Sequence, residues 1–256
     1  MAVVAALAGG GLASAVGLGA SMTLLQFAIG ALNDIVDAPA DAGRRPPKAI
    51  PSGAISPDAA RVVPAVSAGL GLVLAAASGP VVLLLAVVVL GIGAAYDLAA
   101  KGTPWSWLPF AVGIPILPVY GWLGATGAVP QAFAVLIPMA VLAGAGLAVA
   151  NARSDLDGDG RSGTRSVATA LGAERSWWVG AGLMAAATAV GVAFVGRSGW
   201  PVTTVVLVFV GTAVVAAGIA LGRGQAASAR RRGWELQAVG AAIAATGWVA
   251  GMIPGP

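Results

Sequence analysis

The sequence predicts an all-α membrane protein, a polytopic bundle of transmembrane helices, from its composition, its apolar runs and the distribution of its charges. Of the 256 residues, 58% are hydrophobic and only 9% are charged. Such a composition is typical of chains that lie within a lipid bilayer. Because the apolar runs follow one another with short interruptions, we expect residues 1–256 to form a single integral-membrane domain.

Eight apolar runs are long enough to cross the bilayer, since a spanning helix needs about 20 mostly apolar residues. They lie near residues 14–36, 59–78, 81–100, 105–125, 131–151, 175–196, 201–222 and 234–253. A shorter apolar piece, Met1 to about Leu12, precedes them and contains three glycines in a row, which weaken a helix. We interpret this piece as a truncated first helix or a re-entrant segment. Counted as a helix, it brings the predicted total to about nine.

The charged residues gather on one side of this arrangement. With nine spans, the loops that follow even-numbered spans, together with their flanks, hold 13 of the 14 lysines and arginines. Only Arg197 lies on the other side, and all ten acidic residues lie with the basic majority. An excess of Lys and Arg marks the cytoplasmic side of a membrane protein. We therefore expect a multi-pass protein of the cell membrane whose functional loops face the cytoplasm.

Two residue types are missing from the sequence, and their absence limits the chemistry. The chain has no cysteine, which excludes disulfides and thiolate nucleophiles, and no histidine, which removes the commonest metal ligand. A metal ion must therefore be held by oxygen ligands, and a proton must be moved by a carboxylate, a lysine, a tyrosine or the substrate. The net charge of +4 on so apolar a chain does not indicate nucleic-acid binding.

The first candidate site is an acidic stretch at the end of the apolar run Leu18–Leu32. Asp34, Asp37 and Asp41 are spaced by three and then four residues, so on a helix their carboxylates share one face, with Asn33 beside them. Three carboxylates on one face repel one another unless a cation lies between them. Mg²⁺ suits this set because it prefers oxygen ligands and is often bound by one or two carboxylates and a substrate phosphate. A solvated helix end without function is the alternative interpretation.

A second acidic stretch repeats the pattern. The apolar run Ala132–Ala150 ends in Asn151, and Asp155 and Asp159 follow at steps of four, again on one predicted helical face. If the two acidic helix ends faced each other, they would form a binuclear metal site for a diphosphate.

Several cationic and polar side chains near the two stretches are candidates for binding phosphate oxygens, because metal ions alone do not neutralise a diphosphate. The competing explanation is the positive-inside rule for Arg45 and Lys48, and anchoring of the helix end by a snorkelling side chain for Lys101. The candidates are Arg45, Lys48, Tyr96, Lys101, Arg161 and Arg165.

As a set, these motifs resemble those of the UbiA superfamily of intramembrane prenyltransferases. The resemblance rests on Asn-Asp-x-x-Asp-x-x-x-Asp at 33–41, the phrase Ile50-Pro51-Ser52-Gly53-x-Ile55-Ser56, Tyr96-x4-Lys101 and Asp155-x-x-x-Asp159. The motifs occur in the family order along nearly the whole chain. The resemblance implies about nine transmembrane helices around a central cavity. It also implies Mg²⁺-dependent transfer of a prenyl group from a polyprenyl diphosphate to a small acceptor.

The resemblance further implies roles for individual residues. One Mg²⁺ would be held by Asp34, Asp37 and Asp41, and a second by Asp155 and Asp159. The catalytic residues would be Asp34, Asp37, Asp155 and Lys101, and the substrate-binding residues Asn33, Arg45, Lys48, Tyr96, Asn151, Arg161 and Arg165. Lys48 stands where the family usually has an arginine. Ala152 stands where many members carry a further aspartate, which predicts a poorer second metal shell.

Aromatic residues of the run near 105–125 are candidates for a dry cavity wall, since aromatic faces stabilise a carbocation and exclude water. Trp105 and Trp107 fit the aromatic belt at the membrane interface, whereas Phe110 and Tyr120 lie deeper and are the candidates for substrate contact.

Two other functions remain open on the sequence alone. The same diphosphate site would suit phosphoribosyl transfer from a phosphoribosyl diphosphate to a polyprenyl phosphate, a variant within the family. A non-catalytic membrane transporter or lipid-binding bundle would also carry acidic residues near the membrane. The expected partners are a polyprenyl diphosphate, a small acceptor and the lipid bilayer, with no nucleic acid and no protein partner evident.

Overall fold

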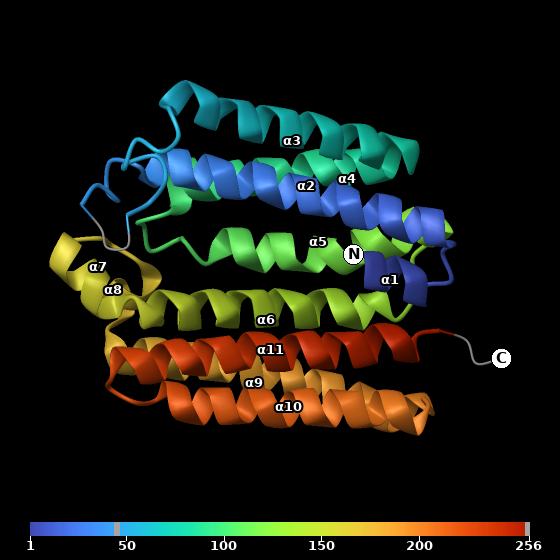
Figure 1. Ribbon diagram of the computed structural model, residues 1–256. Helices are drawn as coiled ribbons and strands as arrows, with labels where there is room; N and C mark the ends of the chain where they lie inside the picture. The colour runs from blue at the N-terminus through green and yellow to red at the C-terminus, as the bar shows by residue number, and fades with distance from the viewer. Residues whose placement is uncertain (44–46, 254–256) are drawn as a thin grey trace. The chain divides into compact units, whose positions relative to one another are not determined.

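The computed structural model describes residues 1–43 and 47–253, leaving aside the side chains at 197 and 198. In these residues the chain forms eleven α-helices and one π-helical turn and no β-strand, which confirms the all-α prediction (Figure 1). The chain divides into two compact units. The first comprises Met1–Ala99 and Tyr120–Gly127, and the second comprises Ala100–Val119 and Ala128–Pro256.

The first unit is built around α2, the helix that leads into the first acidic stretch. α2 lies along α3 and also contacts α1 and α4 (Figure 1). The elements are α1 (Ala2–Leu7), α2 (Leu12–Asp37), α3 (Pro57–Ala77), α4 (Pro80–Ala95) and the π-helical turn η1 (Tyr96–Ala100). Both α3 and α4 begin with a proline, whose missing amide hydrogen costs nothing at that position. The Ser56 side chain caps α3 by accepting a hydrogen bond from the Ala59 amide.

Tyr120 anchors the centre of the first unit. Its side chain is fully buried, and its hydroxyl oxygen lies 2.7 Å from Ser21 Oγ. Ser21 Oγ donates its one hydrogen to the Gly71 carbonyl at 2.7 Å, so the Tyr120 hydroxyl donates to Ser21. These two hydrogen bonds pair polar groups whose burial inside a membrane would be costly if they had no partner. Tyr120 is therefore engaged in packing between helices.

The second unit contains the second acidic stretch and the C-terminal helices. α5 (Leu108–Thr126) begins in this unit and ends in the first. The other elements are α6 (Phe133–Ser154), α7 (Leu156–Ser162), α8 (Val167–Leu171), α9 (Ala173–Ser198), α10 (Val202–Gly222) and α11 (Ala227–Gly251). α6 packs against α9 and α11, and α10 and α11 form a long hairpin (Figure 1).

Glycines at steps of seven residues bring the backbones of α10 and α11 together. They are Gly211 and Gly218 on α10 and Gly233, Gly240 and Gly247 on α11. A Cβ atom added at Gly240 would lie 2.6 Å from the Gly211 carbonyl oxygen, and one at Gly218 would lie 2.7 Å from the Gly233 carbonyl oxygen. A spacing of seven places residues on one side of a helix, and small residues there let membrane helices approach closely. The hairpin is thus held by backbone contact.

Seven helices in the described part of the chain are long and apolar enough to cross a membrane: α2, α3, α4 with its π-helical extension, α5, α6, α9 and α10. The predicted count of about nine is therefore not confirmed. α1 has only six residues. The run predicted near 234–253 lies within α11, whose 25 residues include charged and polar side chains in the first half. The chain is nevertheless an integral multi-pass membrane protein by its seven apolar helices.

Candidate functional site

The first acidic group consists of Asn33, Asp34, Asp37 and Asp41 at the end of α2. The helix ends at Asp37, but the Asp41 amide donates to the Asp37 carbonyl at 2.9 Å, so the chain continues for one more helical turn. This turn preserves the spacing that the sequence predicts, and it brings Asp41 back toward Asp34. Asp41 is buried, with 3% of its surface exposed, whereas Asp34 is exposed.

Lys48 lies between two carboxylates of this group. Its Nζ is 3.1 Å from Asp34 Oδ1 and 2.9 Å from Asp41 Oδ2. The hydrogen bond that Lys48 donates to Asp41, and then the one that it donates to Asp34, raises the pKa of Lys48 above its ordinary value. Lys48 therefore stays charged and offsets the repulsion between the two carboxylates. The structure brings Lys48 to the acidic group, where it binds the two carboxylates. The predicted contact of Lys48 with a phosphate stays a prediction.

Asp97 is a contact of the first acidic group that the sequence analysis does not assign. The Asn33 side-chain amide donates from Nδ2 to Asp97 Oδ1 at 2.8 Å. Asp97 is 5% exposed and lies in the π-helical turn η1, which joins the end of α4 to Lys101. Tyr96, the first residue of η1, and Lys101 are both half-buried. The Tyr96-x4-Lys101 motif thus contains a π-helical turn, a feature frequent at functional sites.

The second acidic group, Asn151, Asp155 and Asp159, is not on one continuous helical face, so this part of the prediction is wrong. α6 ends at Ser154, and Asp155 has backbone angles φ −99° and ψ 5°, which break the helix before α7 begins. Asn151 therefore lies in the last turn of α6, Asp155 at the break and Asp159 in α7. A strict period of four does not apply across the break.

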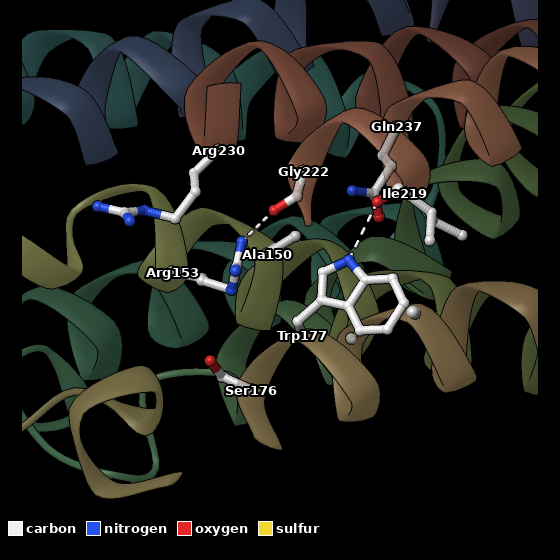
Figure 2. A pocket seen from close by; sticks show the side chains of 10 residues that line it. Ala150, Arg153, Ser176, Trp177, Ile219, Gly222, Arg230 and Gln237 are labelled. Carbon is white, nitrogen blue, oxygen red and sulfur yellow. Dashed lines mark hydrogen bonds between the residues drawn. The ribbon is translucent and has the colours of Figure 1, made fainter. Parts of the chain in front are cut away.

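α7 is held in place by an ion pair with α11. Arg230, which is 4% exposed, donates from Nη2 to Asp157 Oδ2 at 2.5 Å. The buried Arg153, just before the helix break, donates from Nε to the Ala173 carbonyl at 3.0 Å and from Nη1 to the Gly222 carbonyl (Figure 2). The two arginines thus connect the acidic segment to the ends of α9, α10 and α11.

In the described part of the chain, two cavities near the second group differ greatly in size. The pocket in Figure 2 is lined by residues that include Arg153, Arg230 and Gln237, and its volume of about 20 Å³ suits one water molecule. An open hollow of about 360 Å³ is lined by residues of α7, of α8 and of the loop between them, including Asp159 on α7 and Arg165 in the loop. Of the two cavities compared in the described part of the chain, this hollow, which combines a carboxylate with a cation, is the one large enough for a phosphate group.

Two of the predicted cations have not yet been placed. Arg161 is exposed on α7, and Arg45 lies outside the described residues. In the described parts of the chain, no three acidic side chains lie together as a group ready to hold a metal ion. The two acidic groups belong to different units, the first in Met1–Ala99 and the second in Ala128–Pro256. Both offer the hard oxygen ligands that Mg²⁺ prefers.

Comparisons with solved structures show the same fold. A UbiA homolog from Aeropyrum pernix K1 is 24% identical with a TM-score of 0.76, over 98% of this chain and 95% of that one. A digeranylgeranylglyceryl phosphate synthase is 16% identical with a TM-score of 0.76, over 98% and 91%. A UbiA homolog from Archaeoglobus fulgidus bound to GPP and Mg²⁺ is 18% identical with a TM-score of 0.69, over 98% and 94%. A search of curated proteins gives no match.

A family profile decides the classification. The profile of the UbiA prenyltransferase family matches residues 1–241, which is nearly the whole chain and includes both acidic groups. The match agrees with the fold shared with the solved UbiA homologs. The chain belongs to the UbiA prenyltransferase family.

Proposed function

We propose that this protein transfers a prenyl group from a polyprenyl diphosphate to a small acceptor, with the diphosphate bound through Mg²⁺ at the two acidic groups. The observation that carries the proposal is the family match together with two oxygen-rich groups, each beside a cation. Solved relatives from Archaeoglobus fulgidus bind Mg²⁺ with GPP or with DMAPP. The absence of cysteine and histidine leaves oxygen as the metal ligand throughout this chain.

The two acidic groups and the cations near them offer what a diphosphate leaving group needs, which is oxygen ligands for Mg²⁺ and charged donors for the phosphate oxygens. Asn33, Asp34, Asp37 and Asp41 would hold one Mg²⁺, and Asp155 and Asp159 the other. Bound Mg²⁺ neutralises charge on the diphosphate and so makes it a better leaving group. Lys48, Lys101 and Arg165 would bind the remaining phosphate oxygens as charged donors, and Tyr96, Asn151 and Arg161 would orient the diphosphate.

The reaction itself is a substitution at an allylic carbon. The bond from this carbon to the diphosphate oxygen breaks, and the electron pair leaves with the diphosphate. A nucleophilic atom of the acceptor then bonds to the allylic carbon and loses its proton. Because the chain has no histidine, that proton passes to a carboxylate or to the departing diphosphate.

Metal removal tests the proposed function directly. Membranes that contain the protein are incubated with radiolabelled prenyl diphosphates of several lengths, and the labelled lipid is identified. We expect a new labelled product with Mg²⁺, none with EDTA, and recovery when excess Mg²⁺ is restored. Without the metal ion, the negative charge that develops on the departing diphosphate is not stabilised. Transfer that persists in EDTA would contradict the metal assignment. Consumption of labelled phosphoribosyl diphosphate in place of the prenyl donors would favour the phosphoribosyl variant.

The orientation in the membrane gives a second prediction. We propose that the loop between α2 and α3 faces the cytoplasm, because the basic residues gather on that side. The natural chain has no cysteine, so Ser52→Cys introduces a single reporter in an exposed position. In intact cells an impermeant maleimide should label Ala128→Cys, which three apolar helices separate from Ser52, and should leave Ser52→Cys unlabelled until the cells are opened. The reverse pattern would overturn the orientation.

A further inference from the structure

The contact between Asn33 and Asp97 defines the orientation of one side chain in the first acidic group. An asparagine amide carries a donor on one side and an acceptor on the other, and the two exchange when the amide flips. A carboxylate oxygen accepts a hydrogen bond, and Asp97 Oδ1 accepts one from Asn33 Nδ2 at 2.8 Å, so the donor side of the amide faces Asp97. Oδ1 of Asn33 then points away from Asp97.

We propose that Asp97 is a positioning residue. It holds the Asn33 amide so that Asn33 Oδ1 can bind the cation at the first acidic group. The inference rests on the proposed function, since it needs a divalent cation at Asp34. A carbonyl oxygen is a suitable ligand for Mg²⁺, whereas the NH₂ group of a flipped amide would repel it. By excluding the flipped state, Asp97 improves cation binding without touching the cation.

The burial of Asp97 supports this role. A carboxylate that is 5% exposed carries a large desolvation cost, and a side chain needed only for packing would be apolar. The π-helical turn Tyr96–Ala100 places this acid at the end of α4, next to the last turns of α2. Partners of this kind, which orient the residues around a metal ion, typically change metal affinity by about 10- to 100-fold when they are mutated.

The test measures cation binding without catalysis. The full-length protein in nanodiscs is titrated with Mn²⁺, and free Mn²⁺ is followed by electron paramagnetic resonance. We expect Asp97→Asn, which lets either side of an amide face Asn33, and Asp97→Ala, which removes the acceptor, to weaken Mn²⁺ binding by about tenfold or more. The matched control is Asp58→Asn, the same change in an acid on α3 whose side chain is 93% exposed. The control should bind Mn²⁺ as the wild type does.

Two combined variants separate positioning from a general structural effect. In an Asn33→Ala background, Asp97→Asn should cause no further loss, because the side chain that it orients is gone. Exchanging the two residues, Asn33→Asp with Asp97→Asn, restores an amide-to-carboxylate hydrogen bond and should recover most of the affinity. Equal losses with and without Asn33, or no loss in either Asp97 variant, would overturn the inference.

The proposed function can fail separately. If Asp34→Asn weakens Mn²⁺ binding but the Asp97 variants do not, the metal site stands and only the role of Asp97 is wrong. If Mn²⁺ binding is absent in the wild type, or unchanged by Asp34→Asn, the metal assignment itself is wrong, and the role of Asp97 falls with it.

Discussion

Asp34→Asn is expected to lower the rate of prenyl transfer by about a hundredfold or more, because the change removes a charged oxygen ligand where the diphosphate develops negative charge. The rate is measured as labelled lipid formed per unit of protein at saturating donor. The fold should survive. Asp34 has a side chain that is 56% exposed, and Lys48 keeps its contact with Asp41. Loss of such an exposed ion pair costs at most about 1 kcal/mol of stability.

Asp58→Asn provides the comparison, because it removes the charge from an exposed acid on α3 that forms an ion pair with Arg61, three residues further along the helix. This variant should retain wild-type transfer. Asp155→Asn, in the second acidic group, should match Asp34→Asn, since each group is assigned one cation. Wild-type rates in either variant would refute the assignment of that residue, and an equal loss in Asp58→Asn would show that the assay reports general damage.

Gly233→Val is expected to destabilise the protein by about 3 kcal/mol or more, the upper range for overpacking a core. A Cβ at this position would lie 2.5 Å from the Cα and N of Gly222 and 2.7 Å from the Gly218 carbonyl oxygen. These are backbone atoms, which cannot turn aside as a side chain can. α10 and α11 would therefore have to separate. Thermal unfolding followed by circular dichroism in detergent measures the loss.

Gly182→Val is the matched control on α9, because a Cβ there has no heavy atom within 4 Å. Both variants replace a helical glycine by the same β-branched residue, so the difference between them isolates the backbone contact. We expect Gly182→Val to change the unfolding temperature little. Similar temperatures for the two variants would contradict the close approach of α10 and α11.

That Asp34 and Asp41 lie close enough to share Lys48 was predictable, because the periodicity of a helix depends only on local spacing. The spacing of three and four residues survives the end of α2, since one more helical turn follows Asp37. The same reasoning fails for Asn151, Asp155 and Asp159. Their spacing is regular, but the chain leaves the helix at Asp155, in a segment that contains several glycines and aspartates. These residue types favour turns and weaken periodic predictions.

Asp97 and the ion pair between Arg230 and Asp157 could not be found from spacing. Asn33 and Asp97 are 64 residues apart, and Arg230 and Asp157 are 73 apart, so only the packing of helices brings each pair together. The signal available in the sequence was weak: an acidic residue at the end of an apolar run. The predicted count of about nine spans is not confirmed, since α11 combines a polar first half with an apolar second half and is not among the seven apolar helices of the described residues.

The glycine contacts of the hairpin have a consequence at its charged end. They fix the axial register of α11 against α10, since the helices can approach only where glycine meets glycine or a bare backbone carbonyl. A slide of α11 by one helical turn would move Arg230 by about 5.4 Å, beyond reach of Asp157. The glycines between α10 and α11 therefore determine where Arg230 holds the aspartate-rich helix α7, although they make no contact with α7 themselves.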